Sequence, residues 1–148
     1  MSDSARDTGR IVVGVDGSDA SKAALLWAVA QGAASGASVE AVAAWEAPVD
    51  WYGLVPQSDD KTVAAEGVAE RLEGIVAETV GSPPPVEIRT TVTEGNPASV
   101  LVDAAQEARL LVVGNRGHGR FSEAFLGSVS LRCAQHATVP VVIVRAPG

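Results

Sequence analysis

The chain is poor in cysteine, in basic residues and in long hydrophobic runs, and each shortage excludes a class of protein. Its 148 residues include one cysteine, Cys133, so neither an intrachain disulfide framework nor a four-cysteine zinc site can form. Only 11 lysines and arginines stand against 18 acidic residues, a formal net charge of −7. Phosphate backbones and acidic membrane surfaces are bound by clustered cations, so we expect no nucleic-acid partner and no membrane partner. No apolar run reaches the roughly 18 residues that a membrane-spanning helix needs.

The amino-terminal segment also lacks the pattern of an export signal. The first ten residues, MSDSARDTGR, are polar and charged and contain no apolar core of a signal peptide. We therefore expect a cytoplasmic protein with a flexible tail over residues 1–9 and a single domain over residues 10–148. Hydrophobic residues make up 47% of the chain, which is enough to build a packed core.

Short apolar runs alternate with helical patterns along the chain. Strand patterns cover residues 11–15, 39–45, 86–93, 110–113 and 139–144. Helical patterns cover residues 18–35, 61–80, a segment that starts at 96–97, and 127–136. This alternation predicts an α/β fold, an open parallel sheet with helices on both faces. In such sheets ligands bind at the carboxyl ends of the strands, which here are near Asp16, Trp45 and Gly114.

The densest chemical signal is a glycine-rich loop after the fourth predicted strand. It runs Gly114-Asn115-Arg116-Gly117-His118-Gly119-Arg120 and is followed, after a gap, by Gly127-Ser128-Val129-Ser130. Glycines allow the backbone to approach a ligand closely, and the N–H groups of a helix N-terminus attract anions. The loop side chains of Arg116, His118 and Arg120 add donors and positive charge. The pattern favours a phosphate cradle, and a tight turn with solvated cations is the structural alternative.

Other phosphate-binding patterns do not fit the spacing. A Walker A loop ends in Gly-Lys, but the only lysines are Lys22 and Lys61, far from the glycines. A dinucleotide fingerprint starting at Gly117 has Ser122 where its third glycine belongs. A phosphate-accepting receiver domain needs an acidic pair after the first strand, and Asp16 stands alone there.

Two groups of polar and aromatic residues allow more than one interpretation. Asp16 could accept a hydrogen bond from a ribose hydroxyl or hold a metal-bound phosphate, or it could cap the following helix together with Ser18. Trp45, Trp51 and Tyr52 could form a wall beside a flat ring, or they could cover an edge of the core.

The chain offers little for metal binding or nucleophilic catalysis. His118 and His136 are the only histidines, and neither has a partner ligand at metal-binding spacing. We expect His136 to cap the last helix and Cys133 to be a small core residue. Ser128 has no histidine near it in the sequence that could activate its hydroxyl.

Taken together, these residues resemble the universal stress protein family. Its nucleotide-binding members carry the pattern G-x2-G-x9-G-[ST] after the fourth strand, and Gly114, Gly117, Gly127 and Ser128 match it. The family opening V-G-x-D-G-S is matched by Val13 to Ser18, and its closing strand by residues 139–144. The likeness covers residues 10–145.

The resemblance implies a Rossmann-like sheet of order 3-2-1-4-5 that binds ATP or another adenine nucleotide, with Mg²⁺ as a candidate companion ion. Phosphates and ribose would be held by Gly114, Asn115, Arg116, Gly117, His118, Gly119, Arg120, Gly127, Ser128, Val129 and Ser130. Gly14, Val15 and Asp16 would lie beside ribose and adenine, and the backbone of Ala44 would face the adenine. Asn115 stands where family members commonly carry serine.

The final strand predicts an assembly. Val141–Val144 is apolar, and at a sheet edge it would expose unpaired backbone groups, which natural proteins seldom leave bare. Pairing with the same strand of a second chain would give a two-fold homodimer, and the family resemblance points the same way.

Three functions remain in competition. The first is a nucleotide-binding regulatory switch, with at most slow hydrolysis because no general base and no second carboxylate beside Asp16 is evident. The second is a weak ATPase or a self-phosphorylating protein with Ser128 or Ser130 as acceptor. The third is a dimeric interaction module that works without nucleotide.

Overall fold

The computed structural model describes residues 9–46, 61–116 and 126–147. Residues 1–8 of the expected tail, and the aromatic residues Trp51 and Tyr52, lie outside these ranges.

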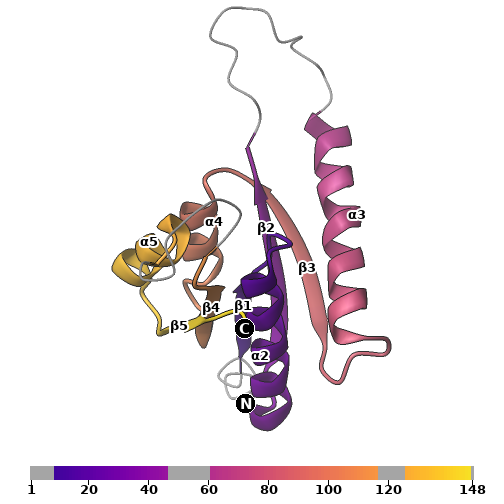
Figure 1. The fold of residues 1–148 in the computed structure, drawn as a ribbon, viewed down its shortest axis with the longest axis vertical. Helices are drawn as coiled ribbons and strands as arrows, with labels where there is room; N and C mark the ends of the chain where they lie inside the picture. The colour runs from indigo at the N-terminus through magenta and orange to yellow at the C-terminus, as the bar shows by residue number, and fades with distance from the viewer. Residues whose placement is uncertain (1–8, 47–60, 117–125, 148) are drawn as a thin grey trace, which may run out of the picture.

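Five strands form one parallel sheet in the order β3-β2-β1-β4-β5 (Figure 1). The strands are β1 (Arg10–Gly14), β2 (Ser38–Trp45), β3 (Ile88–Glu94), β4 (Leu110–Gly114) and β5 (Val141–Val144). The predicted fold class and strand order are confirmed. β5 begins two residues later than the sequence pattern indicated, because Pro140 has no N–H group to donate to β4.

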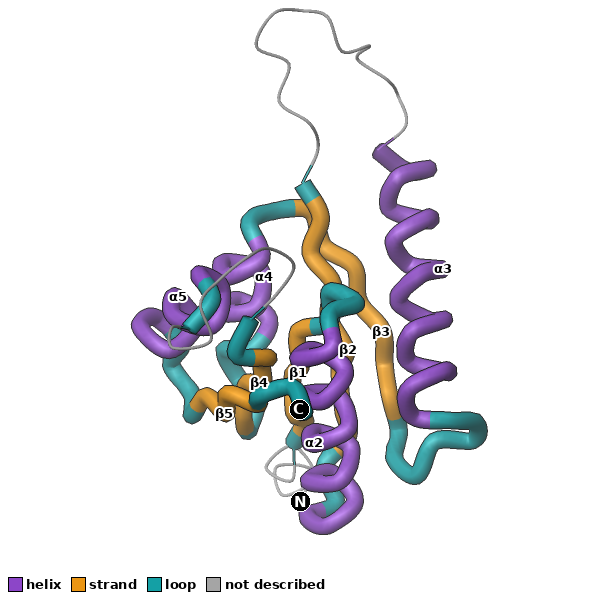
Figure 2. The backbone as a smooth tube through the Cα atoms, in the orientation of Figure 1, coloured by secondary structure: helices purple, strands orange, loops and turns teal. Residues whose placement is uncertain are grey.

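Two pairs of helices cover the two faces of the sheet (Figures 1 and 2). The helices are α2 (Asp19–Ser35), α3 (Lys61–Val80), α4 (Pro97–Ala104) and α5 (Ser128–His136). Val13 and Val39 belong to the core cluster under α2 and α3, whereas Val12 and Val42 belong to the cluster under α4 and α5. Alternate residues of each strand therefore pack into two separate cores, one on each face of the sheet. None of the helices in the described ranges is both long enough and apolar enough to cross a bilayer.

Local capping sets where the helices begin and end. Ser18 caps α2 by accepting a hydrogen bond from the Ser21 N–H at 3.2 Å, and Gly36 ends it in the left-handed conformation, with φ of 79°. The Asn96 side chain caps α4 by accepting from the N–H groups of Ala98 and Ser99, at 3.1 and 3.3 Å. All these caps were predicted from the sequence, and they place the N-termini of α2 and α4 at the carboxyl edge of the sheet.

A polar cluster ties the opposite end of α4 to the sheet. The Arg10 guanidinium pairs with the Glu40 carboxylate at 2.9 Å and also donates to the Ala104 carbonyl at 2.9 Å. The second oxygen of Glu40 accepts a hydrogen bond from the Thr91 hydroxyl at 2.7 Å. Because a cation at a helix C-terminus stabilises the last carbonyl groups, Arg10 helps to fix the orientation of α4.

Candidate nucleotide site

A cavity of about 300 Å³ opens at the carboxyl ends of β1, β2 and β4. β1 lies between β2 and β4, so the strand order reverses at this place, where open α/β sheets bind their ligands. The ends of these strands and the first turns of three helices line it: Gly14, Val15, Asp16, Ser21, Val42, Ala44, Pro97, Leu101, Val113, Gly114, Arg116, Ser128, Val129 and Ser130.

The structure brings most of the described candidate residues together at this cavity. Those that line it are Gly14, Val15, Asp16, Ala44, Gly114, Arg116, Ser128, Val129 and Ser130. Asn115 and Gly127 are both buried and do not line it. Gly117, His118, Gly119 and Arg120 lie outside the described residues.

The N-terminus of α5 forms part of the cavity wall. Ser128, Val129 and Ser130 make up its first turn, in which N–H groups have no acceptor within the helix. The residue before them, Gly127, is buried and donates its own N–H to the Asn115 carbonyl at 2.7 Å. This bond fastens the helix start to the end of β4. The first turn of α5 thus presents backbone donors and a positive dipole to an anion in the cavity.

The Ser130 hydroxyl also helps to connect the start of α5 to the end of β4. It is 2% exposed and lies 3.0 Å from the Gly127 carbonyl oxygen and 3.1 Å from that of Asn115. A buried hydroxyl that donates to backbone carbonyls is a poor phosphoryl acceptor. Ser128, by contrast, is exposed. Of the two acceptor candidates named from the sequence, the geometry favours Ser128.

Gly114 is required for packing, which the sequence interpretation did not foresee. A Cβ on Gly114 would lie 2.7 Å from the Cβ and the carbonyl carbon of Ala20, and 2.9 Å from the Ser21 nitrogen. These are helix atoms that cannot move aside cheaply. The glycine at this position therefore lets α2 pack directly on the end of β4, in addition to lying in the cavity wall.

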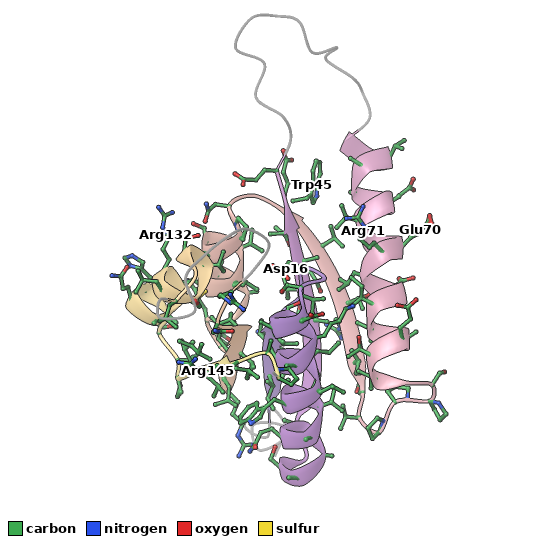
Figure 3. The ribbon with its side chains drawn as sticks, viewed as in Figure 1. Asp16, Trp45, Glu70, Arg71, Arg132 and Arg145 are labelled. Atoms are coloured by element: carbon green, nitrogen blue, oxygen red, sulfur yellow. The ribbon has the colours of Figure 1, made fainter. Side chains whose placement is uncertain are left out.

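Asp16 is held at the cavity rim by the turn that starts α2 (Figure 3). Its Oδ1 accepts hydrogen bonds from the N–H and the hydroxyl of Ser18, and its own N–H donates to Ser21 Oγ at 3.2 Å. The sequence predicted that Asp16 caps α2 together with Ser18. This prediction is confirmed, although Asp16 acts indirectly, by orienting the capping residue Ser18. Capping and ligand contact are compatible, since the exposed Asp16 also lines the cavity.

Five further lining residues are apolar. Val42 and Ala44 come from β2, Pro97 and Leu101 from α4, and Val113 from β4. Of these only Ala44 was named as a candidate from the sequence, and Ser21 was missed as well. The spacing of Val42 and Ala44 puts them on one face of a strand, and the i, i+4 spacing of Pro97 and Leu101 puts them on one face of a helix, but neither spacing distinguishes a cavity wall from the core.

Trp45 does not belong to this wall. It is half-buried, it is absent from the lining residues, and its side chain lies between the end of β2 and α3 (Figure 3). It is also not among the residues that pack against either core cluster, so the core-edge interpretation stays a prediction.

Within the described ranges, acidic and metal-binding side chains are scarce around the cavity. No group of three or more histidine, cysteine, aspartate or glutamate residues is placed there to hold a metal ion. Asp16 is the one carboxylate among the lining residues that the structure describes. Cys133 lies on the buried side of α5 and is a core residue, as expected. Its burial raises the pKa of the thiol to about 11.

The profile of the universal stress protein family matches residues 8–145. The chain belongs to this family. A universal stress protein of Mycolicibacterium smegmatis is 35% identical over 136 residues, which are 91% of this chain and 45% of that protein. Universal stress protein Rv2623 of Mycobacterium tuberculosis is 37% identical over 138 residues, 91% of this chain and 44% of that protein. The chain thus spans about half the length of these relatives.

Solved structures of the family share the fold. A universal stress protein in complex with cAMP is 28% identical, with a TM-score of 0.64 over 93% of this chain and 97% of that one. UspA from Lactobacillus plantarum is 26% identical, with a TM-score of 0.70 over 92% and 97%. A universal stress protein from Archaeoglobus fulgidus in complex with dAMP is 23% identical, with a TM-score of 0.61 over 91% and 96%, a likeness of fold alone.

Proposed function

We propose that the cavity binds an adenine nucleotide, with ATP as the leading ligand and Mg²⁺ as a candidate companion ion, and that the protein acts as a nucleotide-dependent regulatory switch of the stress response. The observation that carries this proposal is that one cavity is lined both by apolar side chains of β2, β4 and α4 and by the first turn of α5. A purine ring needs the first environment and a phosphate needs the second. The relative solved with cAMP supports an adenine ligand for this family.

In this proposal different lining residues contact different parts of the nucleotide. The N–H groups of Ser128, Val129 and Ser130 hold phosphate, and the half-buried Arg116 supplies positive charge beside them. Asp16 accepts hydrogen bonds from the ribose. The apolar side chains of Val42 and Leu101 contact the adenine. Mg²⁺, when bound, would neutralise phosphate charge, and Asp16 is the described lining residue that suits it.

The same lining favours binding over rapid turnover. Among the described residues of the cavity, Asp16 and Arg116 are the charged ones and there is no histidine or glutamate. A carboxylate engaged with Ser18 is a weak candidate for activating a water molecule at a γ-phosphate. We therefore propose slow hydrolysis at most, with self-phosphorylation at Ser128 as the alternative enzymatic function.

We also propose that the protein works as a cytoplasmic homodimer through β5. This strand lies at the edge of the sheet, and all four of its residues are half-buried. The carbonyls of Pro140 and Val144 accept from β4, so the backbone groups of Val141 and Ile143, which alternate with them, face the open edge. A second copy would pair with those groups.

The direct test is to heat-denature freshly purified protein and identify the released nucleotide by chromatography and mass. Near-stoichiometric ATP supports the switch. ADP or AMP favours the enzymatic alternative, which a phosphate-release assay against a protein-free control then measures. An empty protein that also fails to bind added ATP contradicts the proposal and favours a nucleotide-independent module.

A further inference from the structure

A second hollow lies between α4 and α5. It has a volume of about 350 Å³ and is lined by Ala98, Ser99, Val102, Asp103, Arg132 and His136. It shares no lining residue with the nucleotide cavity, although the same two helices serve both. We call it the α4–α5 groove.

The groove carries charges of both signs that are not neutralised by each other. Asp103 and Arg132 are exposed, and neither forms an ion pair or a hydrogen bond through its side chain within the described part of the chain. Ser99 and Asp103 are one helical turn apart on α4, as are Arg132 and His136 on α5, so each helix contributes two polar groups. Arg132 extends from α5 on the side of the molecule remote from α3 (Figure 3).

The remaining lining gives the groove an apolar floor. Ala98 is 5% exposed and Val102 is half-buried. A pure anion drawn to Arg132 would be repelled by Asp103, and a pure cation drawn to Asp103 would be repelled by Arg132. A ligand that carries both charges can pair with Asp103 and Arg132 at the same time. A groove of this volume holds a small molecule.

We propose that the α4–α5 groove binds a small zwitterion of the free amino-acid class, with its carboxylate on Arg132 and Ser99 and its ammonium on Asp103. The guanidinium suits a carboxylate because its N–H groups form a planar fork that matches the two oxygens. The apolar floor contacts the amino-acid side chain. Because the groove is separate from the nucleotide cavity, the ligand binds whether or not nucleotide is present.

The test is a titration of the full-length, isotope-labelled protein with each of the twenty free L-amino acids, followed by amide chemical shifts. We expect saturable shifts around Ser99, Asp103, Arg132 and His136 for at least one of them. The N-acetyl and carboxamide forms of the same amino acid each remove one charge, and they should bind about tenfold more weakly.

Replacing a charged side chain by a neutral one of near-equal size tests whether that charge binds the ligand. Arg132→Gln and Asp103→Asn should each weaken binding about tenfold, because each removes one charged hydrogen-bond partner. Arg71→Gln and Glu70→Gln remove charges of the same two signs at exposed positions of α3 that do not line the groove, and they should leave binding unchanged. All four positions are exposed, so the variants should fold, and an unchanged affinity for ATP verifies this.

Two results would overturn the proposal. One is the absence of saturable shifts for all twenty amino acids up to about 10 mM, a concentration that corresponds to very weak binding. The other is equal binding of free and capped amino acids, which would show that the charges of the groove only interact with solvent. Either result leaves nucleotide binding untouched, so the two proposals fail separately.

Discussion

Gly114 and Ala20 pack so closely that a Cβ on the glycine would lie 2.7 Å from the Cβ of the alanine. The contact joins the end of β4 to the first turn of α2. Because Asp16 and Ser18 form the turn that starts α2, the same contact positions both sides of the nucleotide cavity. The first glycine of the G-x2-G-x9-G-[ST] pattern is thus a packing requirement of this fold.

Gly114→Ala should therefore lower the free energy of unfolding by about 1–3 kcal/mol, the usual cost of an extra methyl group in a tight contact. Gly67→Ala is the matched control. Gly67 is exposed on α3 with nothing within 4 Å of an added Cβ, so alanine should stabilise there by about 0.5–1 kcal/mol. Urea unfolding measures both. Normal stability of Gly114→Ala together with lost nucleotide binding would show that this glycine serves only the ligand.

Arg116→Gln should weaken ATP binding about tenfold while adenosine binding changes little, because the guanidinium interacts with phosphate and not with the base. Arg71→Gln removes the same charge from a residue of α3 that does not line the cavity, and it serves as control. Calorimetric titration with both ligands gives the comparison. An equal loss of affinity for ATP and adenosine would contradict a contact between Arg116 and phosphate.

Self-phosphorylation, if present, should depend on Ser128 and not on Ser130. Label transferred from γ-labelled ATP should disappear in Ser128→Ala and persist in Ser130→Ala. The second variant should instead lose about 1 kcal/mol of stability, since it removes the buried hydrogen bond that fastens α5 to β4. Label that survives in Ser128→Ala and vanishes in Ser130→Ala would reverse this assignment.

Because Cys133 is buried, the free energy of unfolding should decrease at alkaline pH. Burial raises the pKa of its thiol from 9.0 to about 11, so the unfolded chain loses this proton at lower pH than the folded one. The contribution is complete below pH 9 and is lost as the pH rises from 9 to 11, by up to about 2 kcal/mol. Urea unfolding at several pH values, with Cys133→Ala as control, measures it. An equal pH dependence in the variant would assign the effect to other groups.

Sedimentation tests the role of β5 in assembly. The wild type should sediment at twice its chain mass of 15.1 kDa, and Ile143→Pro at the single mass, because proline removes an N–H group that faces the open edge. Ile143→Val keeps that group and should remain dimeric. Circular dichroism confirms that the variants fold. A wild type that stays monomeric at high concentration would exclude the proposed dimer.

Local signals in the sequence were sufficient for much of the fold. Ser18 and Gly36 bracket α2, and Asn96 with Pro97 starts α4, because each cap is formed by residues adjacent in the chain. The strand order came from the family resemblance, since alternation of strands and helices does not determine it.

The candidate site was predicted where its residues follow a strand or start a helix. Asp16, Gly114 and the first turn of α5 were found in this way. Val42 and Leu101 were not, because an apolar residue in a strand or a helix has the same pattern whether it faces the core or a cavity. The packing role of Gly114 depends on the position of α2, which is set by tertiary contacts.

The most direct test of the account is to follow the amide signals of the nucleotide-free protein while ATP and Mg²⁺ are added. The account predicts saturable shifts that are largest for Ser128, Val129 and Ser130, with smaller ones at Asp16 and Ala44. Shifts confined to other parts of the chain, or none at all, would contradict nucleotide binding at the carboxyl edge of the sheet.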